Sequence, residues 1–203
     1  MSELARVAPR EGTVASLVRE LTGVLAAGSI EDAGREARDI VAAVHGEARF
    51  WAALHENELV RRERAEDARR AAGLRLAGAP FAYAVGVAPF RHLTLHVDER
   101  VLIPRQETEQ LVEEVLARAT HGLAVDIGTG SGAIALALAS EGHFDRVIGT
   151  DVSRGALAVA EGNAARLVGE LRAPVEFRQG ALFAPLAGVP IAIKDALCTI
   201  DMP

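Results

Sequence analysis

The sequence predicts an α/β protein in which an N-terminal helical bundle precedes an incomplete doubly wound parallel sheet. Apolar residues recur at helical spacing from Thr13 to Ala72, which indicates amphipathic helices. After position 122, short apolar runs alternate with helical segments instead. Strands that alternate with helices form parallel sheets with helices on both faces, so we expect that architecture in the second half.

The first segment, residues 1–77, is expected to consist of helices alone. Gly28 and Ser29 end a first helical run, and three further runs follow around residues 40–44, 50–54 and 58–76. A bundle of this size has a small core, so we expect it to depend on its neighbour for stability.

A connector, residues 78–106, begins where Gly78 and Pro80 interrupt the helical pattern. Its β-prone stretches at residues 81–87 and 92–97 are expected to pair as a β-hairpin.

Residues 107–184 are expected to form the sheet domain. A helix at residues 110–118, with Thr108 capping its first turn, precedes the first strand. The remaining elements are strands at 123–127, 146–150 and 174–177, joined by helices at 132–140 and 154–167. Because so few strands are predicted, we expect this domain to be truncated.

The loop after the first strand, Asp126 to Gly132, has the pattern of a ligand-binding turn. Its glycines let the backbone approach a ligand closely, and Asp151 ends the next strand, where a carboxylate can accept hydrogen bonds from ribose hydroxyls. A purely structural tight turn is one alternative. A dinucleotide is another, but Asp126 would repel its pyrophosphate. The cationic amine and sulfonium of S-adenosylmethionine suit that carboxylate better. As an alternative, Asp151 only caps the next helix through Ser153.

Several motifs resemble the HemK-type protein-(glutamine-N5) methyltransferases, which modify peptide chain release factors. They are Phe81-Ala82-Tyr83 with Gly86, then Phe90, the segment Val101 to Glu109, and the loop Asp126 to Gly132. The similarity covers about residues 10–184. In its most specific part, Pro104 to Glu109, Gln106 replaces the second proline of the family's Pro-Arg-Pro-Glu-Thr-Glu.

The resemblance implies a fold of the S-adenosylmethionine-dependent methyltransferase type, S-adenosylmethionine as cofactor, and a release factor as the protein substrate recognised by residues 1–77. It assigns cofactor binding to Asp126, Gly128, Thr129, Gly130, Ser131, Gly132, Asp151 and Leu182. The glycine loop would hold the methionine part, Asp151 the ribose, and Leu182 the adenine. It assigns a substrate loop to Pro104, Arg105, Glu107 and Glu109. Ala181 replaces a commonly acidic residue, so one adenine contact is expected to be missing.

The family's catalytic motif, Asn-Pro-Pro-Tyr, is absent from the sequence. That motif holds the glutamine amide nitrogen in line with the sulfonium methyl, and orientation supplies most of what methyl transfer needs. No catalytic residue is therefore assigned, and methylation of the glutamine in the release factor's Gly-Gly-Gln loop is expected to be impaired. An inactive remnant that binds cofactor or release factor is the first alternative, and an amidase fragment is the second.

The tail, residues 185–203, resembles the catalytic-lysine segment of amidase-signature enzymes, with Lys194 as the matching lysine. No serine segment of those enzymes follows. A junction between unrelated coding sequences is the favoured explanation, because Lys194 is the only lysine in the chain. Alternatively, residues 189–193 dock as a fourth strand on the edge of the first, or Asp195 replaces the missing Asn.

Composition narrows the function classes further. A net charge of −6 argues against broad nucleic-acid or anionic-membrane binding, which favour a basic face. Cys198 is the only cysteine, so no disulfide can form within the chain, and no metal site is expected. The sequence has no apolar signal core and no run of the roughly 20 apolar residues that span a bilayer. We expect a cytoplasmic protein.

Overall fold

The computed structural model describes residues 10–119, 121–180 and 191–193. The chain divides into two compact units, residues 1–85 and 86–203. Each unit has its own cluster of buried apolar residues. The helices within the described ranges are too short or too polar to serve as membrane spans.

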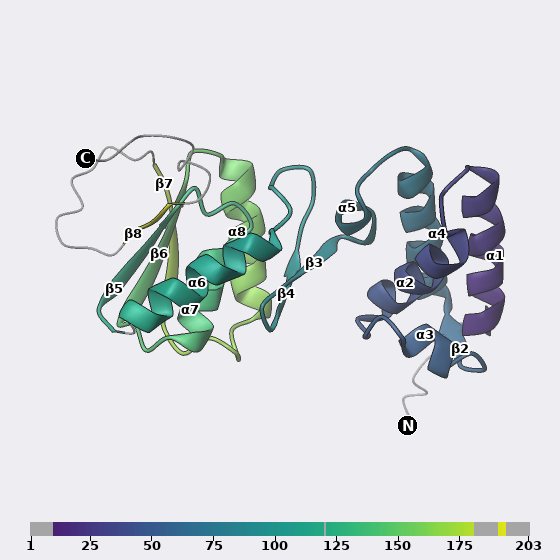
Figure 1. Ribbon diagram of the computed structural model, residues 1–203, viewed down its shortest axis with the longest axis horizontal. Coiled ribbons are helices and arrows are strands. Elements are labelled where there is room, and N and C mark those ends of the chain that lie inside the picture. The colour runs from purple at the N-terminus through teal and green to yellow at the C-terminus, as the bar shows by residue number, and fades with distance from the viewer. Residues whose placement is uncertain (1–9, 120, 181–190, 194–203) are drawn as a thin grey trace, which may run out of the picture. The chain divides into compact units, whose positions relative to one another are not determined.

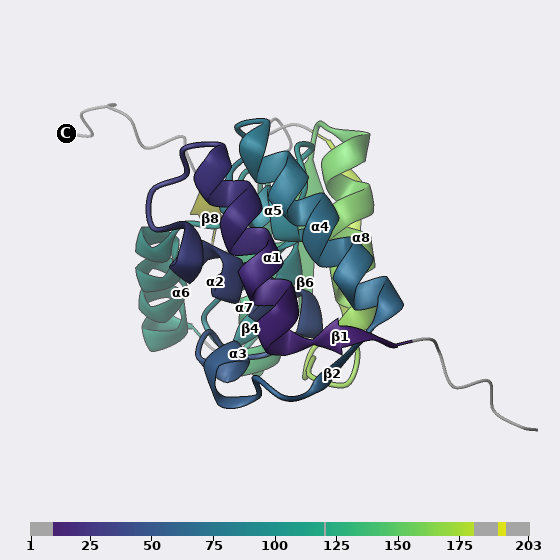
Figure 2. The same ribbon diagram turned by 90° about the vertical axis from the view of Figure 1, so that its right-hand side faces the viewer.

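The first unit is built mainly from helices (Figures 1 and 2). They are α1 (Val14–Ala27), α2 (Ala33–His45), α3 (Trp51–Leu54), α4 (Arg62–Leu76) and α5 (Phe81–Val85). The helices α1, α2 and α4 lie side by side, and their buried faces meet in one core that includes Leu21, Ile40 and Ala68. Apolar residues three and four positions apart give each helix one such face.

Thr13 begins α1 with a capping box. Its hydroxyl accepts a hydrogen bond from the Ser16 amide, and the Ser16 hydroxyl accepts one from the Thr13 amide. These bonds pair two amides at a helix start, where backbone donors otherwise lack partners. The predicted first helix is confirmed.

The first unit also contains a small antiparallel sheet, so the prediction of helices alone is wrong. The strand β1 (Arg10–Thr13) pairs with β2 (Leu59–Arg61). The amide of Val14 donates to the Glu58 carbonyl at 2.9 Å, which fastens the start of α1 beside β2. Strands of three or four residues are too short to show the alternation by which strands are recognised in a sequence.

The second unit combines a β-hairpin with a four-stranded parallel sheet (Figure 1). Its elements are β3 (Val87–Phe90), β4 (Leu93–His96), α6 (Gln106–Arg118), β5 (Leu123–Ile127), α7 (Ala133–Glu141), β6 (Arg146–Asp151), α8 (Arg154–Arg166), β7 (Val175–Gln179) and β8 (Ile191–Ile193). The strand order is β7-β6-β5-β8, and every neighbouring pair is parallel. The order changes direction at β5, as in doubly wound sheets, so the predicted fold class is confirmed.

Two local predictions around the connector are wrong. Residues 81–85 form helix α5, and the hairpin consists of β3 and β4 instead. Thr108 does not cap a helix, because α6 already begins at Gln106 and Thr108 lies inside its first turn. Two acidic side chains share that turn, where the helix dipole favours negative charge.

The described helices of the second unit cover one face of the sheet. The parallel register aligns Ala124, Val147 and Val175 on this face, and these residues pack with α6, α7 and α8 in one core. Right-handed crossovers that step in the same direction put their helices on the same side of a sheet. The expectation of helices on both faces is not met within the described residues.

The strand β8 covers one edge of β5. Residues 125, 126 and 127 pair in parallel with residues 191, 192 and 193. The alternative in which the tail docks as a fourth strand is therefore confirmed for residues 191–193. Lys194 and Asp195 lie outside the described residues.

Candidate cofactor site

The loop between β5 and α7 is shaped by three glycines with positive φ angles. Gly128, Gly130 and Gly132 have φ angles of 73°, 56° and 83°, a region that favours glycine. The amides of Gly128 and Thr129 both donate to the Thr150 carbonyl in β6, each at 2.8 Å. The loop is therefore held at the carboxyl ends of two parallel strands, where ligands of doubly wound proteins bind.

The space beside the loop differs from one glycine to the next. A Cβ atom on Gly128 would meet no other atom within 4 Å, and one on Gly130 would meet only a carbonyl oxygen, at 3.9 Å. On Gly132 it would lie 3.1 to 3.3 Å from side-chain atoms of Leu136, Ala160 and Phe177. The first two glycines thus leave room for a ligand against the backbone, whereas the third lets α7 pack closely on α8 and β7.

Ser131 adds a buried hydroxyl that has no hydrogen-bond partner among the described residues. Buried polar atoms are normally paired, so an unpaired hydroxyl between these glycines marks a place where polar ligand atoms are expected. Together with the open space at Gly128 and Gly130, this hydroxyl fits the polar methionine part of S-adenosylmethionine.

Asp126 is fully buried and orders the loop from within the fold. Its Oδ2 accepts hydrogen bonds from the Thr129 hydroxyl at 2.6 Å and from the Ala135 amide at 3.2 Å. Because Ala135 lies in the first turn of α7, these bonds tie the end of β5 to both the loop and that helix. A direct contact between this carboxylate and the cofactor remains a prediction.

Asp151 ends β6 with a hydrogen bond to each carboxylate oxygen. Oδ2 accepts from the Gly130 amide at 3.0 Å, and Oδ1 accepts from the Ser153 amide at 2.8 Å. Ser153 caps α8 through its own hydroxyl. Each carboxylate oxygen has further lone pairs, so these two bonds orient Asp151 and still leave it able to accept hydrogen bonds from ribose hydroxyls. The alternative in which Asp151 only supports the next helix explains one of the two bonds.

Asn163 of α8 belongs to the site although the sequence did not predict it. Its side chain is 1% exposed and donates to the Ser131 carbonyl at 2.9 Å and to the His96 carbonyl at 3.0 Å. Its Oδ1 accepts from the His96 amide at 2.7 Å. One side-chain amide thus joins the glycine loop to β4. The signal that the sequence offers is a polar residue among the alanines of a helix interior.

The expected substrate loop lies at the start of α6. Arg105 precedes the helix, and both Arg105 and Glu107 are exposed. Glu109 turns toward the hairpin instead, where its Oε1 accepts a hydrogen bond from the Arg91 amide at 3.0 Å. Hydrogen bonds from the Arg91 guanidinium to Glu141 of α7 raise the pKa of Arg91. Arg105 and Glu107 are therefore the members of this loop that a partner can reach.

The remaining residues singled out from the sequence are Pro104, Ala181 and Leu182. Pro104 is half-buried ahead of α6. Leu182 and Ala181, which the resemblance assigns to the adenine side of the site, lie outside the described residues.

Comparison with known families gives a match in each unit. Residues 16–86 match the PrmC N-terminal domain, and residues 124–188 match a methyltransferase domain. The second match includes the glycine loop and Asp151. A methyltransferase domain agrees with S-adenosylmethionine as the expected cofactor of this unit.

Curated relatives resemble the chain over most of its length. The release factor glutamine methyltransferase of Geobacter sulfurreducens is 36% identical over 179 residues, which are 88% of this chain and 62% of that protein. The Bordetella pertussis protein of the same name is 42% identical over 68% of this chain and 52% of its own length. For the Aliivibrio fischeri protein the identity is 47%, over 56% of this chain and 39% of its own length. The chain thus spans between 39% and 62% of these relatives.

The fold and the glycine-loop site define a methyltransferase-domain protein. With its PrmC-type N-terminal domain, the chain is a relative of the release factor glutamine methyltransferases, and the HemK-type resemblance is confirmed.

Proposed function

We propose that the chain binds S-adenosylmethionine at the β5–α7 loop and acts in the cytoplasm on the glutamine side-chain amide in the Gly-Gly-Gln loop of a peptide chain release factor. The observation that carries the proposal is the geometry of this loop. Its glycines leave open space beside the backbone, and the Asp151 carboxylate next to them accepts a hydrogen bond from the Gly130 amide. The names of the relatives support the choice of substrate.

Each part of the site has a role in this proposal. The backbone from Gly128 to Gly132 holds the methionine part of the cofactor. Asp151 accepts hydrogen bonds from the ribose hydroxyls, and Asp126 maintains the conformation of the loop. When bound, S-adenosylmethionine supplies an electrophilic methyl group on its sulfonium. The exposed Arg105 and Glu107 contact the release factor, and residues 1–77 contribute to its recognition.

The proposal assigns no residue to the orientation of the glutamine amide. Asn-Pro-Pro-Tyr does not occur in the sequence, and a poorly oriented nucleophile costs on the order of 100-fold or more in rate. We therefore expect slow methyl transfer by these 203 residues, at a rate well below that of a relative that carries the motif.

Transfer of labelled methyl groups from S-adenosylmethionine to a purified release factor tests the activity. We expect a weak signal that disappears when the glutamine of the Gly-Gly-Gln loop is replaced by alanine. Asp151→Ala should abolish it, while Asp145→Ala should not, because Asp145 is an exposed carboxylate outside the loop. Turnover as fast as that of a relative with the motif would contradict the impaired activity.

Binding without catalysis is the second candidate function, and the missing Asn-Pro-Pro-Tyr favours it. Calorimetry with S-adenosylmethionine, read beside the methylation assay, separates the two candidates. Binding heat without methyl transfer supports the second, and the absence of heat at millimolar ligand rules out both.

A further inference from the structure

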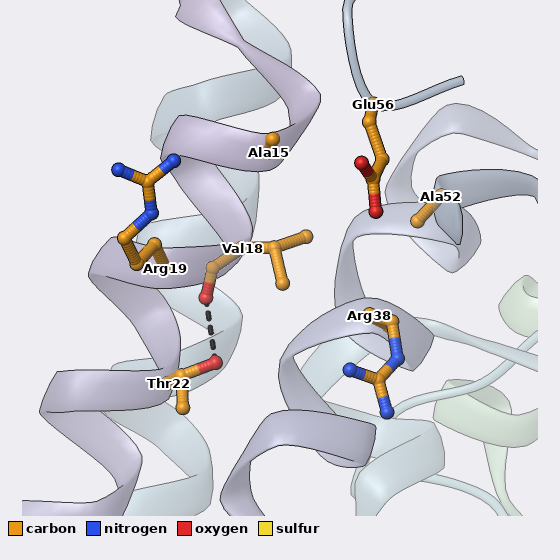
Figure 3. Close-up of a pocket in the computed structure, with 7 residues that line it drawn as sticks. All are labelled: Ala15, Val18, Arg19, Thr22, Arg38, Ala52 and Glu56. Carbon is orange, nitrogen blue, oxygen red and sulfur yellow. Dashed lines mark hydrogen bonds between the residues drawn. The ribbon is translucent and has the colours of Figure 1, made fainter. Parts of the chain in front are cut away.

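A pocket of about 330 Å³ lies in the first unit, between α1, α2 and α3 (Figure 3). Arg38 and Glu56 are on the same wall and carry opposite charges, a combination that favours no single class of ligand. Another set of polar contacts lies in the second unit, at the carboxyl end of β7, where the Gln179 side chain binds the turn that follows Asp151. Because Asp151 is the proposed ribose-binding residue, these contacts bear on a defined ligand.

The end of β7 holds this turn at three points. Gln179 is the last residue of β7 and pairs in the parallel register with Asp151, the last residue of β6. Its Nε2 donates to the Val152 carbonyl at 3.2 Å, and its Oε1 accepts from Nε of Arg154 at 2.9 Å. The amide of Gly180 donates to the Asp151 carbonyl at 3.1 Å.

One peptide unit connects Gln179 with the Asp151 carboxylate. The Val152 carbonyl accepts from Gln179, and the Ser153 amide of the same peptide unit donates to Oδ1 of Asp151 at 2.8 Å. A trans peptide unit is planar, so its C=O and N–H groups point in opposite directions and turn together. Gln179 therefore fixes the direction of the N–H group that holds the carboxylate.

A rotation of this peptide unit would loosen Asp151. The turn is exposed, so water can bind the Val152 carbonyl in other orientations once Gln179 no longer donates to it. The Ser153 amide then moves away from Oδ1, while Oδ2 keeps its bond from the Gly130 amide. A carboxylate that has lost one of its bonds samples more orientations, and ordering it again on a ribose reduces the affinity.

We propose that Gln179 is a positioning residue, which sets the orientation of the Asp151 carboxylate toward the ribose of the cofactor. This inference rests on the proposed function, because it takes Asp151 as the ribose-binding residue. The same contacts offer one alternative, in which Gln179 acts on Arg154 at the start of α8. Gln179→Glu separates the two, because a carboxylate still accepts from Arg154 but cannot donate to the Val152 carbonyl.

Calorimetry of the full chain with S-adenosylhomocysteine and with its 2′-deoxy analogue, which lacks one ribose hydroxyl, tests the inference. We expect the wild type to bind S-adenosylhomocysteine about tenfold or more tightly than the analogue, since the analogue loses a hydrogen bond to a charged group. Gln179→Met keeps the length of the side chain and removes its hydrogen bonds, so it should reduce this ratio of affinities about threefold or more. Gln179→Glu should reduce the ratio as much.

Arg178→Met is the matched control. Arg178 precedes Gln179 in β7, is also exposed, and its guanidinium pairs with Glu176 of the same strand. The ratio of affinities should stay within about twofold of wild type. A general loss of stability weakens the binding of both ligands alike and leaves the ratio unchanged.

The inference alone is overturned if Gln179→Met keeps the wild-type ratio, or if Arg178→Met reduces the ratio equally. A wild-type ratio in Gln179→Glu also overturns it, in favour of the contact with Arg154. A wild-type chain that binds both ligands equally, or neither, contradicts the proposed ribose contact of Asp151 and this inference with it.

Hydrogen exchange of the unliganded chain gives a second measurement that needs no ligand. The Ser153 amide should exchange about three- to tenfold faster in Gln179→Met than in wild type, because its bond to Asp151 opens more often. An unchanged exchange rate at Ser153 would overturn the role of the peptide unit.

Discussion

Asn163 is the residue whose replacement tests the link between the glycine loop and the hairpin. We expect Asn163→Leu to lower the free energy of unfolding by about 3 kcal/mol, because two carbonyls and one amide stay buried without their partner. Affinity for S-adenosylhomocysteine should fall too, since one of those carbonyls belongs to Ser131 in the loop. Urea unfolding and calorimetry measure the two effects.

Ser140→Ala is the matched control for this change. Ser140 is also buried, but its hydroxyl donates to the Ala137 carbonyl within its own helix, at 3.0 Å. We expect a loss of about 1 kcal/mol with unchanged cofactor affinity. An equal loss of affinity in both variants would show that Asn163 acts through general stability alone.

Gly149 in β6 leaves no room for a side chain. A Cβ atom there would lie 2.6 Å from the Phe177 ring and 2.8 Å from the Thr129 hydroxyl, which binds Asp126. We expect Gly149→Ala to cost about 1 to 3 kcal/mol and to weaken cofactor binding, because Thr129 must move. Gly169→Ala has open space around it and should stay within about 0.5 kcal/mol of wild type. Thermal unfolding compares the two variants, and similar costs would contradict the steric explanation.

Residues of the candidate site were predictable where local backbone geometry sets the pattern. The glycines and Asp151 are of this kind, because positive φ angles and the end of a strand leave a trace within a few residues. The role of Asn163 could not be predicted, because its hydrogen bonds join residues that are separated from it by 32 and 67 positions in the sequence. One sequence without an alignment carries no trace of such contacts.

At the scale of helices, an ion pair between α1 and α4 gives the first unit a dependence on pH. Arg69 donates to Glu20 at 2.7 Å, and this hydrogen bond lowers the pKa of Glu20. A carboxyl group with a lowered pKa stabilises the fold above its ordinary pKa and loses that contribution as the pH falls through the lowered value.

The size of this effect is small, because both side chains are more than a third exposed. We expect Glu20→Gln to cost less than about 1 kcal/mol at neutral pH. In acid, the difference from wild type should shrink once the pH falls through the lowered pKa of Glu20, because Glu20 is then protonated. Urea unfolding at the two pH values measures it, and a difference that persists undiminished in acid would point to a cause other than charge.

Long elements were predictable from the sequence, and short ones were not. The helices α1, α2 and α4 repeat their apolar spacing over several turns, so the pattern rises above chance. The five residues of α5 are β-prone and were predicted as a strand. Phe81 and Val85 nevertheless pack on the core of the first unit from one helical turn, so tertiary contact overrides local preference here.

At the scale of the whole sheet, β8 determines whether β5 has an unpaired edge. The N–H groups of successive residues point to opposite edges of a strand, so proline at one of the two positions Ala192 and Ile193 must remove a bond toward β5, and proline at the other must not. We expect one of these two variants to aggregate and to lose amide protection at Val125 or Ile127. Light scattering and hydrogen exchange measure this, with serine at the same positions as the control. Full protection in both proline variants would contradict the pairing.

The class of the second unit was predictable because right-handed crossovers leave few ways to connect alternating strands and helices. The position of β8 was only one of three alternatives for the tail. A short apolar stretch can occupy an edge, a loop or a partner surface, and the choice depends on the free edge of β5 rather than on the stretch itself.

The pairing of β8 with β5 also sets an order of events during synthesis. About sixty residues separate the end of β5 from the start of β8, whereas β6 follows β5 much sooner. At about 5 to 20 residues per second, β5 waits on the order of 3 to 12 seconds for its second neighbour. During that interval the nascent chain exposes a strand edge that a chaperone, or another nascent chain, can reach before β8 does.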